Sequence, residues 1–366
     1  MSLASMAEAL WESDSVPAGV GRGVLAPASW LYGRIVAARN ARYDAKRPPI
    51  TAIPALSIGN LTVGGTGKTP VAAWCVQRLR SYGAHPSIVM RGVGDDEWRV
   101  HTLLNPGVPV IVSPDRVAGL IVARTRGADC AVLDDAFQHR RAARIADIVL
   151  LSADKWTGAA RMLPAGPFRE PLSSLRRASV VVITAKAADA SRIDEVARAA
   201  HTAAPELPQA VIRLVPGSLR LATSLPSVST PSADRSSSGP LKELLTHPPT
   251  WLAARELTAV SAIGDPSAFE AQLRGAGAVL RDVRRFPDHH AFSSAEAAQI
   301  ASGAKGSAGV VCTLKDAVKL APLWPREAPP LWYLSQSVVV DRGAEVLDRA
   351  FARVLAARAA IAPTAG

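Results

Sequence analysis

The chain has 366 residues, which is longer than one compact domain usually is, so we expect two domains. Its hydrophobic content of 48% is ordinary for a folded protein and allows a sizeable core. Its three cysteines, Cys75, Cys130 and Cys312, are far apart and form no CxxC pair, which argues against a disulfide framework or a zinc site and for a reducing compartment. The formal net charge is +11, but much of it is arginine scattered along expected helices, and without a basic patch interleaved with aromatic residues no nucleic-acid partner is predicted.

The first predicted element is a helix over residues 26–39. Leu31 and Ile35 share one helical face, and Trp30 and Tyr32 are aromatic residues of the kind that favours a membrane interface. Basic residues accompany and follow them: Arg34, Arg39, Arg42, Lys46 and Arg47. This pattern suits a helix lying on an anionic membrane surface, and it equally suits a helix packed on its own domain. No stretch is long and apolar enough to span a bilayer, and early acidic residues argue against a signal peptide.

A glycine-rich loop at residues 59–70 reads Gly-Asn-Leu-Thr-Val-Gly-Gly-Thr-Gly-Lys-Thr-Pro. It follows an apolar run and precedes a helical pattern, an arrangement that binds a nucleoside triphosphate. Glycines let backbone N–H groups approach the phosphates, Lys68 would reach the β- and γ-phosphates, and the Thr69 hydroxyl would sit on Mg²⁺. Thr62 stands where the standard spacing has its first glycine. The predicted nucleotide-binding residues are Thr62, Gly64, Gly65, Thr66, Gly67, Lys68 and Thr69.

Apolar strands then alternate with helices, which predicts a mostly parallel sheet covered on both faces. A segment at 223–240 is rich in Ser, Pro and Thr and predicts a flexible linker, beyond which the alternation resumes in a smaller α/β domain. The expected fold is therefore a P-loop NTPase-type sheet followed by a second α/β domain. The expected divisions are an N-terminal helical segment at 1–47, a P-loop domain at 48–215 and the smaller domain at 216–366.

An apolar strand at 130–134 ends in two carboxylates, Asp134 and Asp135. In a P-loop protein, the end of such a strand carries the acid associated with Mg²⁺, so we favour a metal role over an ordinary turn cap. Another acidic stretch, Asp95-Asp96-Glu97, follows the strand at 86–90 near the ligand edge of the sheet. A carboxylate there could take the proton from an acceptor hydroxyl, although a charged surface loop would look the same.

Three further loops carry polar side chains. Arg169, in the proline- and glycine-rich loop at 163–171, could neutralise a transferring phosphate or cap a helix. Asp288 and His289 form an acid/base or orienting pair, or a helix-entry turn. Lys315 opens a helix directly after a strand and could meet anions or solvent.

These stretches together resemble one family, the tetraacyldisaccharide 4′-kinases of lipid A synthesis in Gram-negative bacteria. The resemblance rests on residues 59–70 and on motifs that occur in the family's order along most of the chain. These motifs are Ser29-Trp30-Leu31-Tyr32-Gly33, Arg91-Gly92-Val93-Gly94, Asp134-Asp135-Ala136-Phe137-Gln138-His139, Leu163-Pro164-Ala165-Gly166-Pro167-Phe168-Arg169-Glu170, Ala262-Ile263-Gly264-Asp265-Pro266, Asp288-His289 and Thr313-Leu314-Lys315-Asp316-Ala317.

The resemblance implies transfer of the ATP γ-phosphate to the 4′-hydroxyl of a lipid-linked disaccharide 1-phosphate, with Mg²⁺, by a peripheral protein at the cytoplasmic face of the inner membrane. By the same resemblance, Lys68, Thr69, Asp134 and Asp135 fall on the phosphate and metal positions. Arg169 falls on a phosphate-contacting arginine.

The family's Gly-Asp-Glu motif falls on Asp96-Glu97, which makes Asp96 the candidate base and His289 its candidate partner from the other domain. Asp95 is the alternative base. The chain departs from the family at Ala136, at Val93 and at Trp98, where Gly, Tyr and Pro are usual.

Two other function classes fit parts of the pattern. A P-loop nucleotide switch or metallochaperone-type NTPase fits the Gly-Gly-Thr-Gly-Lys-Thr core, but Val63 stands where many such proteins carry a second lysine, and no partner-facing switch segment is identifiable. A nucleic-acid-dependent ATPase is supported by net charge alone.

Overall fold

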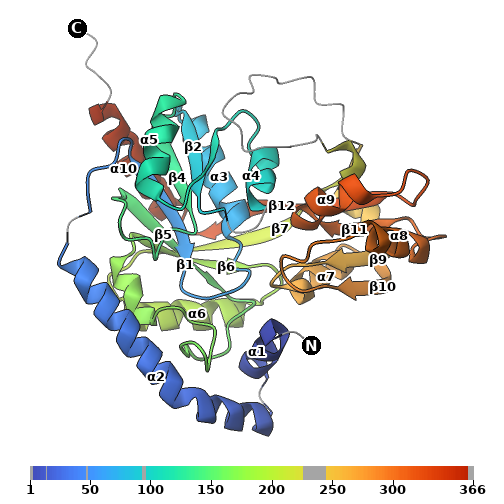
Figure 1. The fold of residues 1–366 in the computed structure, drawn as a ribbon, viewed down its shortest axis with the longest axis horizontal. Helices are drawn as coiled ribbons and strands as arrows, with labels where there is room; N and C mark the ends of the chain where they lie inside the picture. The colour runs from blue at the N-terminus through green and yellow to red at the C-terminus, as the bar shows by residue number, and fades with distance from the viewer. Residues whose placement is uncertain (1–2, 14, 47, 93–95, 226–244, 362–366) are drawn as a thin grey trace. The chain divides into compact units, whose positions relative to one another are not determined.

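The computed structural model describes residues 3–13, 15–46, 48–92, 96–225 and 245–361, and the chain divides into two compact units (Figure 1). The first unit contains Met1–Arg91, Val108–Ile212 and Val340–Gly366, and the second contains Gly92–Gly107 and Arg213–Val339. The second unit therefore includes a short excursion from within the expected P-loop domain. The chain passes between the units at four places along its length.

The first unit is built on parallel strands with β1 in the interior of the sheet. Their order is β6 (Val180–Ala185), β5 (Ala146–Ser152), β1 (Ala55–Asn60), β4 (Cys130–Asp134), β2 (Pro86–Met90) and β3 (Val110–Val112). The run of buried, largely β-branched or small residues in these strands reflects coverage on both faces, as parallel sheets require. The strand β1 runs parallel to β5 on one side and to β4 on the other, so the carboxyl ends of all three strands lie at the same edge of the sheet. The loop after β1 therefore lies at the edge where α/β proteins bind ligands.

Helices cover both faces of this sheet. On one face, α5 (Arg116–Thr125) packs Leu120 against Val89 and Leu133, while α6 (Ala190–Ala203) covers β6. On the other, α3 (Lys68–Ser81) and α10 (Ala344–Ile361) both contact β1 and β4, and Trp74 meets Phe351 with ring centroids 5.6 Å apart. The alternation of apolar strands and helices predicted this arrangement correctly.

The second unit has its own parallel strands. Their order is β10 (Val279–Arg285), β9 (Glu256–Ser261), β11 (Val310–Thr313) and β12 (Leu331–Arg342), with β7 (Gln209–Leu221) beyond them and β8 (Thr246–His247) antiparallel to β7. The helices of this unit are α4 (Glu97–Leu104), α7 (Pro266–Gly275), α8 (Ser294–Gly303) and α9 (Leu314–Leu320). Short 3₁₀ turns lie at Ala222–Ser224, Pro249–Leu252 and Ala321–Leu323, and another, Leu172–Arg177, lies in the first unit. The predicted linker at 223–240 falls mostly outside the described residues.

The elements of the second unit that were not predicted include the strand β10 and the helix α4. The strand β10 reads Val-Leu-Arg-Asp-Val-Arg-Arg, and as an edge strand it is too polar and too exposed to give a clear apolar signal. The helix α4 begins at Glu97, the last residue of the acidic stretch for which a charged surface loop was the alternative, and it contacts α9 of the same unit. It buries Trp98, one of the departures from the family pattern, while Val93 lies outside the described residues.

Two N-terminal helices precede the sheet, α1 (Leu3–Glu12) and α2 (Val16–Asp44) (Figure 1). The helix α2 is twice the length expected from the sequence and contains Pro27, with Ser15 accepting a capping hydrogen bond from the Ala18 N–H. The long proline-rich loop before the 3₁₀ turn at Leu172–Arg177 holds both helices. The carbonyl of Pro164 accepts from Trp11 Nε1 at 2.8 Å, and that of Met162 accepts from Ser29 Oγ at 3.1 Å. One side of α2 therefore packs on its own unit.

The other side of α2 carries exposed apolar side chains. They are Val16, Val20, Val24, Trp30, Leu31 and Ile35, each at least half exposed. Hence the two interpretations of this helix are not exclusive, because it contacts its unit along one side and leaves an apolar stripe uncovered by described residues along another. Within the described residues, no helix is both long and apolar enough to cross a membrane.

Candidate active site

The loop after β1 has the backbone that a phosphate cradle needs. Gly64 and Gly67 have φ values of 96° and 84°, in the left-handed region that side chains with a Cβ seldom adopt. Gly67 is the N-cap of α3, so the free N–H groups and the positive end of the helix dipole lie at Lys68 and Thr69. Thr62, at the position of the missing glycine, pairs instead with Phe168 through an isolated β-bridge, which explains why a threonine is accepted there.

Asn60, the last residue of β1, organises this loop. Its side chain donates to Thr66 Oγ1 at 3.0 Å and accepts from Lys68 Nζ at 3.3 Å. Its Oδ1 also accepts from Arg169 Nη2. Asn60 therefore joins the P-loop lysine to an arginine from a distant loop. Asn60 was not among the predicted site residues. Its position, as a polar residue at the end of a buried strand directly before a glycine loop, could have indicated it.

The acidic pair lies at the end of β4, on the strand beside β1. Asp134 is buried and accepts from the Asp135 N–H at 2.9 Å. Asp135 has a φ of 46° and places Oδ1 at 3.7 Å from Lys68 Nζ and 3.1 Å from Arg169 Nη2. Loss of solvent acts to raise the pKa of Asp135, but the charges of Lys68 and Arg169 outweigh it and hold that pKa below its usual value.

The structure thus brings Lys68, Asp135 and Arg169 together from three segments of the first unit. The backbone N–H of Arg169 donates to the Leu61 carbonyl, so the proline-rich loop lies directly against the P-loop. Close packing explains the glycine at position 59, the first residue of the glycine-rich loop. A Cβ there would lie 2.5 Å from the Cβ of Phe137, which follows the acidic pair. The loop after β4 also supports the P-loop, because Gln138 Nε2 donates to the Asn60 carbonyl at 2.8 Å.

The oxygen donors at this edge fit Mg²⁺ in kind and number. Mg²⁺ is usually bound by one or two carboxylates together with substrate phosphate oxygens and water, and Thr69, Asp134 and Asp135 supply suitable hard oxygens. Across the described part of the chain, no group of three or more His, Cys, Asp or Glu side chains could hold a metal by itself. The donor set therefore fits a metal that is bound together with a nucleotide rather than a metal held by protein ligands alone.

A second polar cluster lies within the second unit. Asp96 is buried, with Oδ1 at 3.5 Å from His289 Nδ1 and Oδ2 at 3.7 Å from Lys319 Nζ. Lys315 Nζ lies 3.1 Å from His289 Nε2 and 2.8 Å from Asp288 Oδ1. Sequence analysis named Asp96, His289 and Lys315, and these residues do lie together. Asp95, the alternative base, falls outside the described residues.

The charges around Asp96 and His289 keep both groups ionised. Burial is the largest single influence on the pKa of Asp96 and acts to raise it, but the interaction with His289 and the charges of Lys315 and Lys319 lower it below its usual value. The interaction with Asp96 raises the pKa of His289 above its usual value. The pair is therefore expected to titrate as a coupled unit. Oδ2 of Asp96 is buried and has no hydrogen-bond partner among the described residues.

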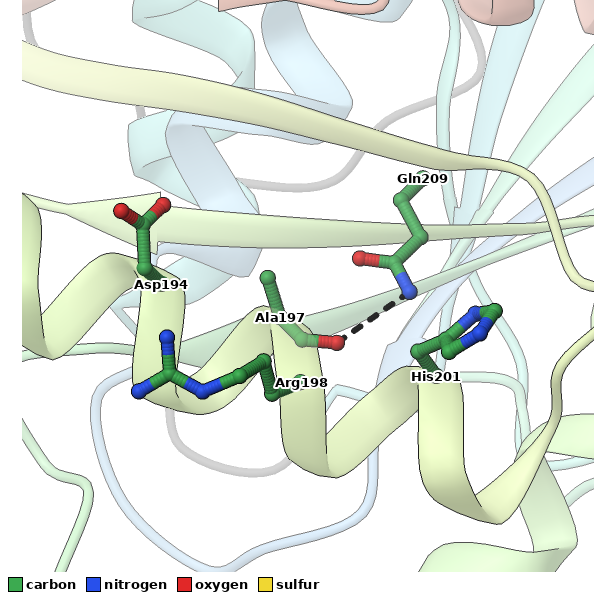
Figure 2. A pocket seen from close by; sticks show the side chains of 5 residues that line it. All are labelled: Asp194, Ala197, Arg198, His201 and Gln209. Carbon is green, nitrogen blue, oxygen red and sulfur yellow. Dashed lines mark hydrogen bonds between the residues drawn. The ribbon is translucent and has the colours of Figure 1, made fainter.

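A shallow pocket in the first unit holds none of the predicted site residues (Figure 2). Its lining comes from one face of α6 and the first residue of β7, and consists of Asp194, Ala197, Arg198, His201 and Gln209. Gln209 Nε2 donates to the Ala197 carbonyl at 3.2 Å, and Asp194 pairs with Arg342 at 2.8 Å. These contacts join α6 to its neighbouring strand and to the end of β12, and we assign the pocket no chemistry.

The doubly wound sheet, the strand–glycine loop–helix with Lys68 and Thr69, and the acidic pair on the adjacent strand define a P-loop phosphotransferase. Comparison with known proteins narrows this class. The model of one family, described as tetraacyldisaccharide-1-P 4′-kinase, matches residues 22–107 and 93–356. The chain belongs to this family.

Individual relatives agree with the family match. A tetraacyldisaccharide 4′-kinase of Halorhodospira halophila is 33% identical over 356 residues, covering 92% of this chain and 93% of that protein. A tetraacyldisaccharide 4′-kinase of Anaeromyxobacter sp. (strain K) is 34% identical over 389 residues and covers 96% of both chains. The crystal structure of LpxK from Aquifex aeolicus in complex with ATP matches with a TM-score of 0.65 and 26% identity, covering 91% of this chain and 99% of that chain.

The activity follows from family membership: the protein is an ATP-dependent kinase that phosphorylates the 4′ position of a tetraacyl disaccharide 1-phosphate in lipid A synthesis. This confirms the resemblance drawn from the motifs and decides for the kinase against the nucleotide-switch alternative.

Proposed function

We propose that Lys68 and Arg169 neutralise the transferring γ-phosphate of ATP, and that Asp96, oriented by His289, accepts the proton of the sugar 4′-hydroxyl. The observation that carries the first half is the position of Asp135, whose carboxylate faces both cations at the end of the P-loop. Two positive side chains that converge there, beside the free N–H groups of α3, form a site for a highly charged phosphate. The ATP seen in the similar Aquifex aeolicus structure supports this choice of nucleotide.

The proposed transfer balances in one step. The 4′-oxygen forms a bond to the γ-phosphorus, the bond from that phosphorus to the β,γ-bridging oxygen breaks, and ADP leaves with the electron pair. The 4′-hydroxyl proton moves to Asp96 Oδ2, an oxygen that no described group hydrogen-bonds. His289 then stabilises Asp96 through Oδ1. Positioning and charge neutralisation supply most of the catalysis in this class of reaction.

Mg²⁺ is the proposed companion of the nucleotide, held through Thr69, Asp134 and Asp135. When bound, it would offset the charge that develops on the β- and γ-phosphate oxygens. Asp135 is the more exposed carboxylate of the pair, with 44% of its side chain accessible. We therefore assign it the closer role and Asp134 the supporting one, since Asp134 is buried and accepts a backbone N–H.

We also propose that α2 places the enzyme on an anionic membrane surface, at the cytoplasmic face of the inner membrane, as a peripheral protein. The exposed apolar stripe from Val16 to Ile35 supports this, together with Arg34, Arg39 and Arg42 along the same helix. A stripe of this kind buries apolar side chains at the headgroup boundary while the basic residues attract anionic lipid. The lipid-linked acceptor would be met at that surface.

The test of the catalytic assignment is phosphate transfer from labelled ATP to a tetraacyl disaccharide 1-phosphate in detergent micelles. Asp96→Asn is expected to lower kcat by about 10²–10⁴-fold, the usual contribution of a positioned base, with little change in ATP affinity. Asp194→Asn, which removes a carboxylate from an exposed ion pair, is the matched control and should retain full activity. Asp95→Asn tests the alternative base. An Asp96→Asn enzyme with wild-type kcat would refute the assignment.

A further inference from the structure

A lysine that sequence analysis did not select completes the cluster around Asp96. Lys319 lies in the last turn of α9, with only 14% of its side chain exposed. Its Nζ donates to the His290 carbonyl at 3.0 Å and lies 3.7 Å from Asp316 Oδ1. It also lies 5.4 Å above the ring of Phe292. The ammonium is therefore fixed in place by a carbonyl, an aromatic face and a carboxylate.

Asp316 anchors this arrangement from inside the unit. Its side chain is fully buried, with Thr313 Oγ1 donating to Oδ2 at 2.7 Å and the Ala262 N–H donating to Oδ1 at 3.2 Å. Burial raises the pKa of Asp316 above its usual value. Burying such a group is costly unless its partners are held firmly. The Lys319–Asp316 contact at i, i+3 therefore fixes the position of the ammonium relative to α9.

The distance from Lys319 to Asp96 matters chemically. At 3.7 Å, Nζ is close enough for strong attraction to Oδ2 but too far to hydrogen-bond with it. The positive charge therefore favours the carboxylate form while the lone pairs of Oδ2 stay available. Lys315 differs, because it is engaged with Asp288 and His289 on the other side of the pair.

We propose that Lys319 is a positioning residue for phosphoryl transfer: it holds the Asp96 carboxylate opposite a fixed positive charge without occupying the lone pairs of Oδ2. This inference rests on the proposed role of Asp96 as the base. The charged and titratable groups that face Asp96 are His289 from the loop before α8, and Lys315 and Lys319 from α9. Asp288 and Asp316 lie behind them, against Lys315 and Lys319.

The test is the pH profile of kcat/KM for Lys319→Met, which removes the charge but keeps the length of the stem. We expect the midpoint of the acid limb to rise by about one pH unit. The reason is that a nearby positive charge lowers the pKa of a carboxyl by about 1–3 units, and Lys319→Met removes that charge. The lost activity should return in part as the pH rises, and KM for ATP should change little. Lys319→Arg retains the charge and should keep the wild-type midpoint. Lys305→Met, which removes a lysine just beyond α8, is the matched control and should behave as wild type.

The outcomes separate this inference from the proposed function. If Asp96→Asn is inactive while the acid limb of Lys319→Met is unmoved, the role of Lys319 is wrong and the base assignment stands. If Asp96→Asn is fully active, the base assignment itself fails. Should Lys319→Met not fold, Lys319→Gln takes its place, because the amide can still donate to the His290 carbonyl. An unmoved acid limb in that variant would equally overturn the inference.

Discussion

Arg169 and Glu170 are adjacent in the chain, yet their side chains serve different parts of the first unit. Arg169 contacts Asn60 and Asp135 beside the P-loop, whereas Glu170 is fully buried and accepts from Arg177 at 2.7 Å and from Asn40 of α2 at 2.9 Å. The Tyr32 hydroxyl donates to the carbonyl of Arg169 at 3.1 Å. The loop that carries Arg169 to the P-loop is thus also the loop to which the N-terminal helix α2 is attached.

Glu170→Gln is therefore expected to lower kcat as well as stability. The substitution removes the charge that pairs with Arg177 and leaves buried polar groups without full partners, at a cost of about 1–3 kcal/mol in the free energy of unfolding. Urea unfolding measures the stability, and transfer at saturating ATP measures kcat. Glu195→Gln is the control, because Glu195 forms a partly exposed pair with Arg192. Loss of stability at unchanged kcat would show that Glu170 does not position Arg169.

Lys68→Ala is expected to lower kcat by about 10²–10³-fold, as removal of one fixed transition-state donor usually does. The reason is that Lys68 faces Asp135 at the start of α3, where the γ-phosphate is proposed to lie. Circular dichroism should show an unchanged fold. Lys155→Ala removes an ion pair with the half-exposed Glu12, away from the P-loop, and serves as the comparison. Full transfer activity in Lys68→Ala would contradict the phosphate assignment.

The Asp96–His289 pair predicts a pH dependence of stability. Because the pKa of His289 is raised in the folded state, the stabilisation it provides is present below its unfolded pKa and is lost as the pH rises through the folded value. The pKa of Asp96 is lowered, so its contribution is present above the unfolded value of a carboxyl and is lost at acid pH. His289→Ala should consequently be destabilised relative to wild type at pH 5.5 more than at pH 9. Equal differences in free energy of unfolding at both pH values would contradict the coupling.

Val20→Asp and Ile35→Asp should weaken binding to vesicles that contain anionic lipid. Both side chains are more than 60% exposed on α2, so a carboxylate there removes apolar area and adds repulsion without disturbing the core. Wild-type binding should fall with added salt, because the basic residues of α2 attract the surface electrostatically. Val279→Asp alters an exposed valine on the edge strand β10 and should bind like wild type. Point variants are preferable to deletion of 26–47, which would also remove Asn40 from Glu170.

The sequence predicted the first unit well, for identifiable physical reasons. Strands buried on both faces must be continuous apolar runs, so the predicted strands at 86–90 and 130–134 have the bounds that the structure gives β2 and β4. The proposed phosphate site could be selected from spacing, because a glycine loop and its Lys-Thr pair are contiguous in the chain. Motifs in order then gave the family, which the comparisons confirm.

The acceptor side was harder to predict because its residues meet only in three dimensions. Nothing in the local pattern links Lys319 to Asp96, which is more than two hundred residues earlier in the chain, and α4 is too short to give a periodic signal. Asn60 was missed for another reason: its role depends on Arg169, which arrives from a separate loop. The sequence indicated Arg169 only as one of two alternatives, and its contact with Asp135 favours the phosphate role.

The excursion of Gly92–Gly107 into the second unit limits how this enzyme can be dissected. A fragment cut from the chain at Arg213–Val339 would contain His289 and Lys319 but lack Asp96 and α4, whose helix packs on α9. A fragment ending before β7 would keep Asp96 but leave it without its partners. Transplanting the second unit between relatives would therefore require the exchange of two separate segments at four junctions. Exchange of one segment alone would yield chimaeras in which the proposed proton acceptor and its orienting residues come from different parents.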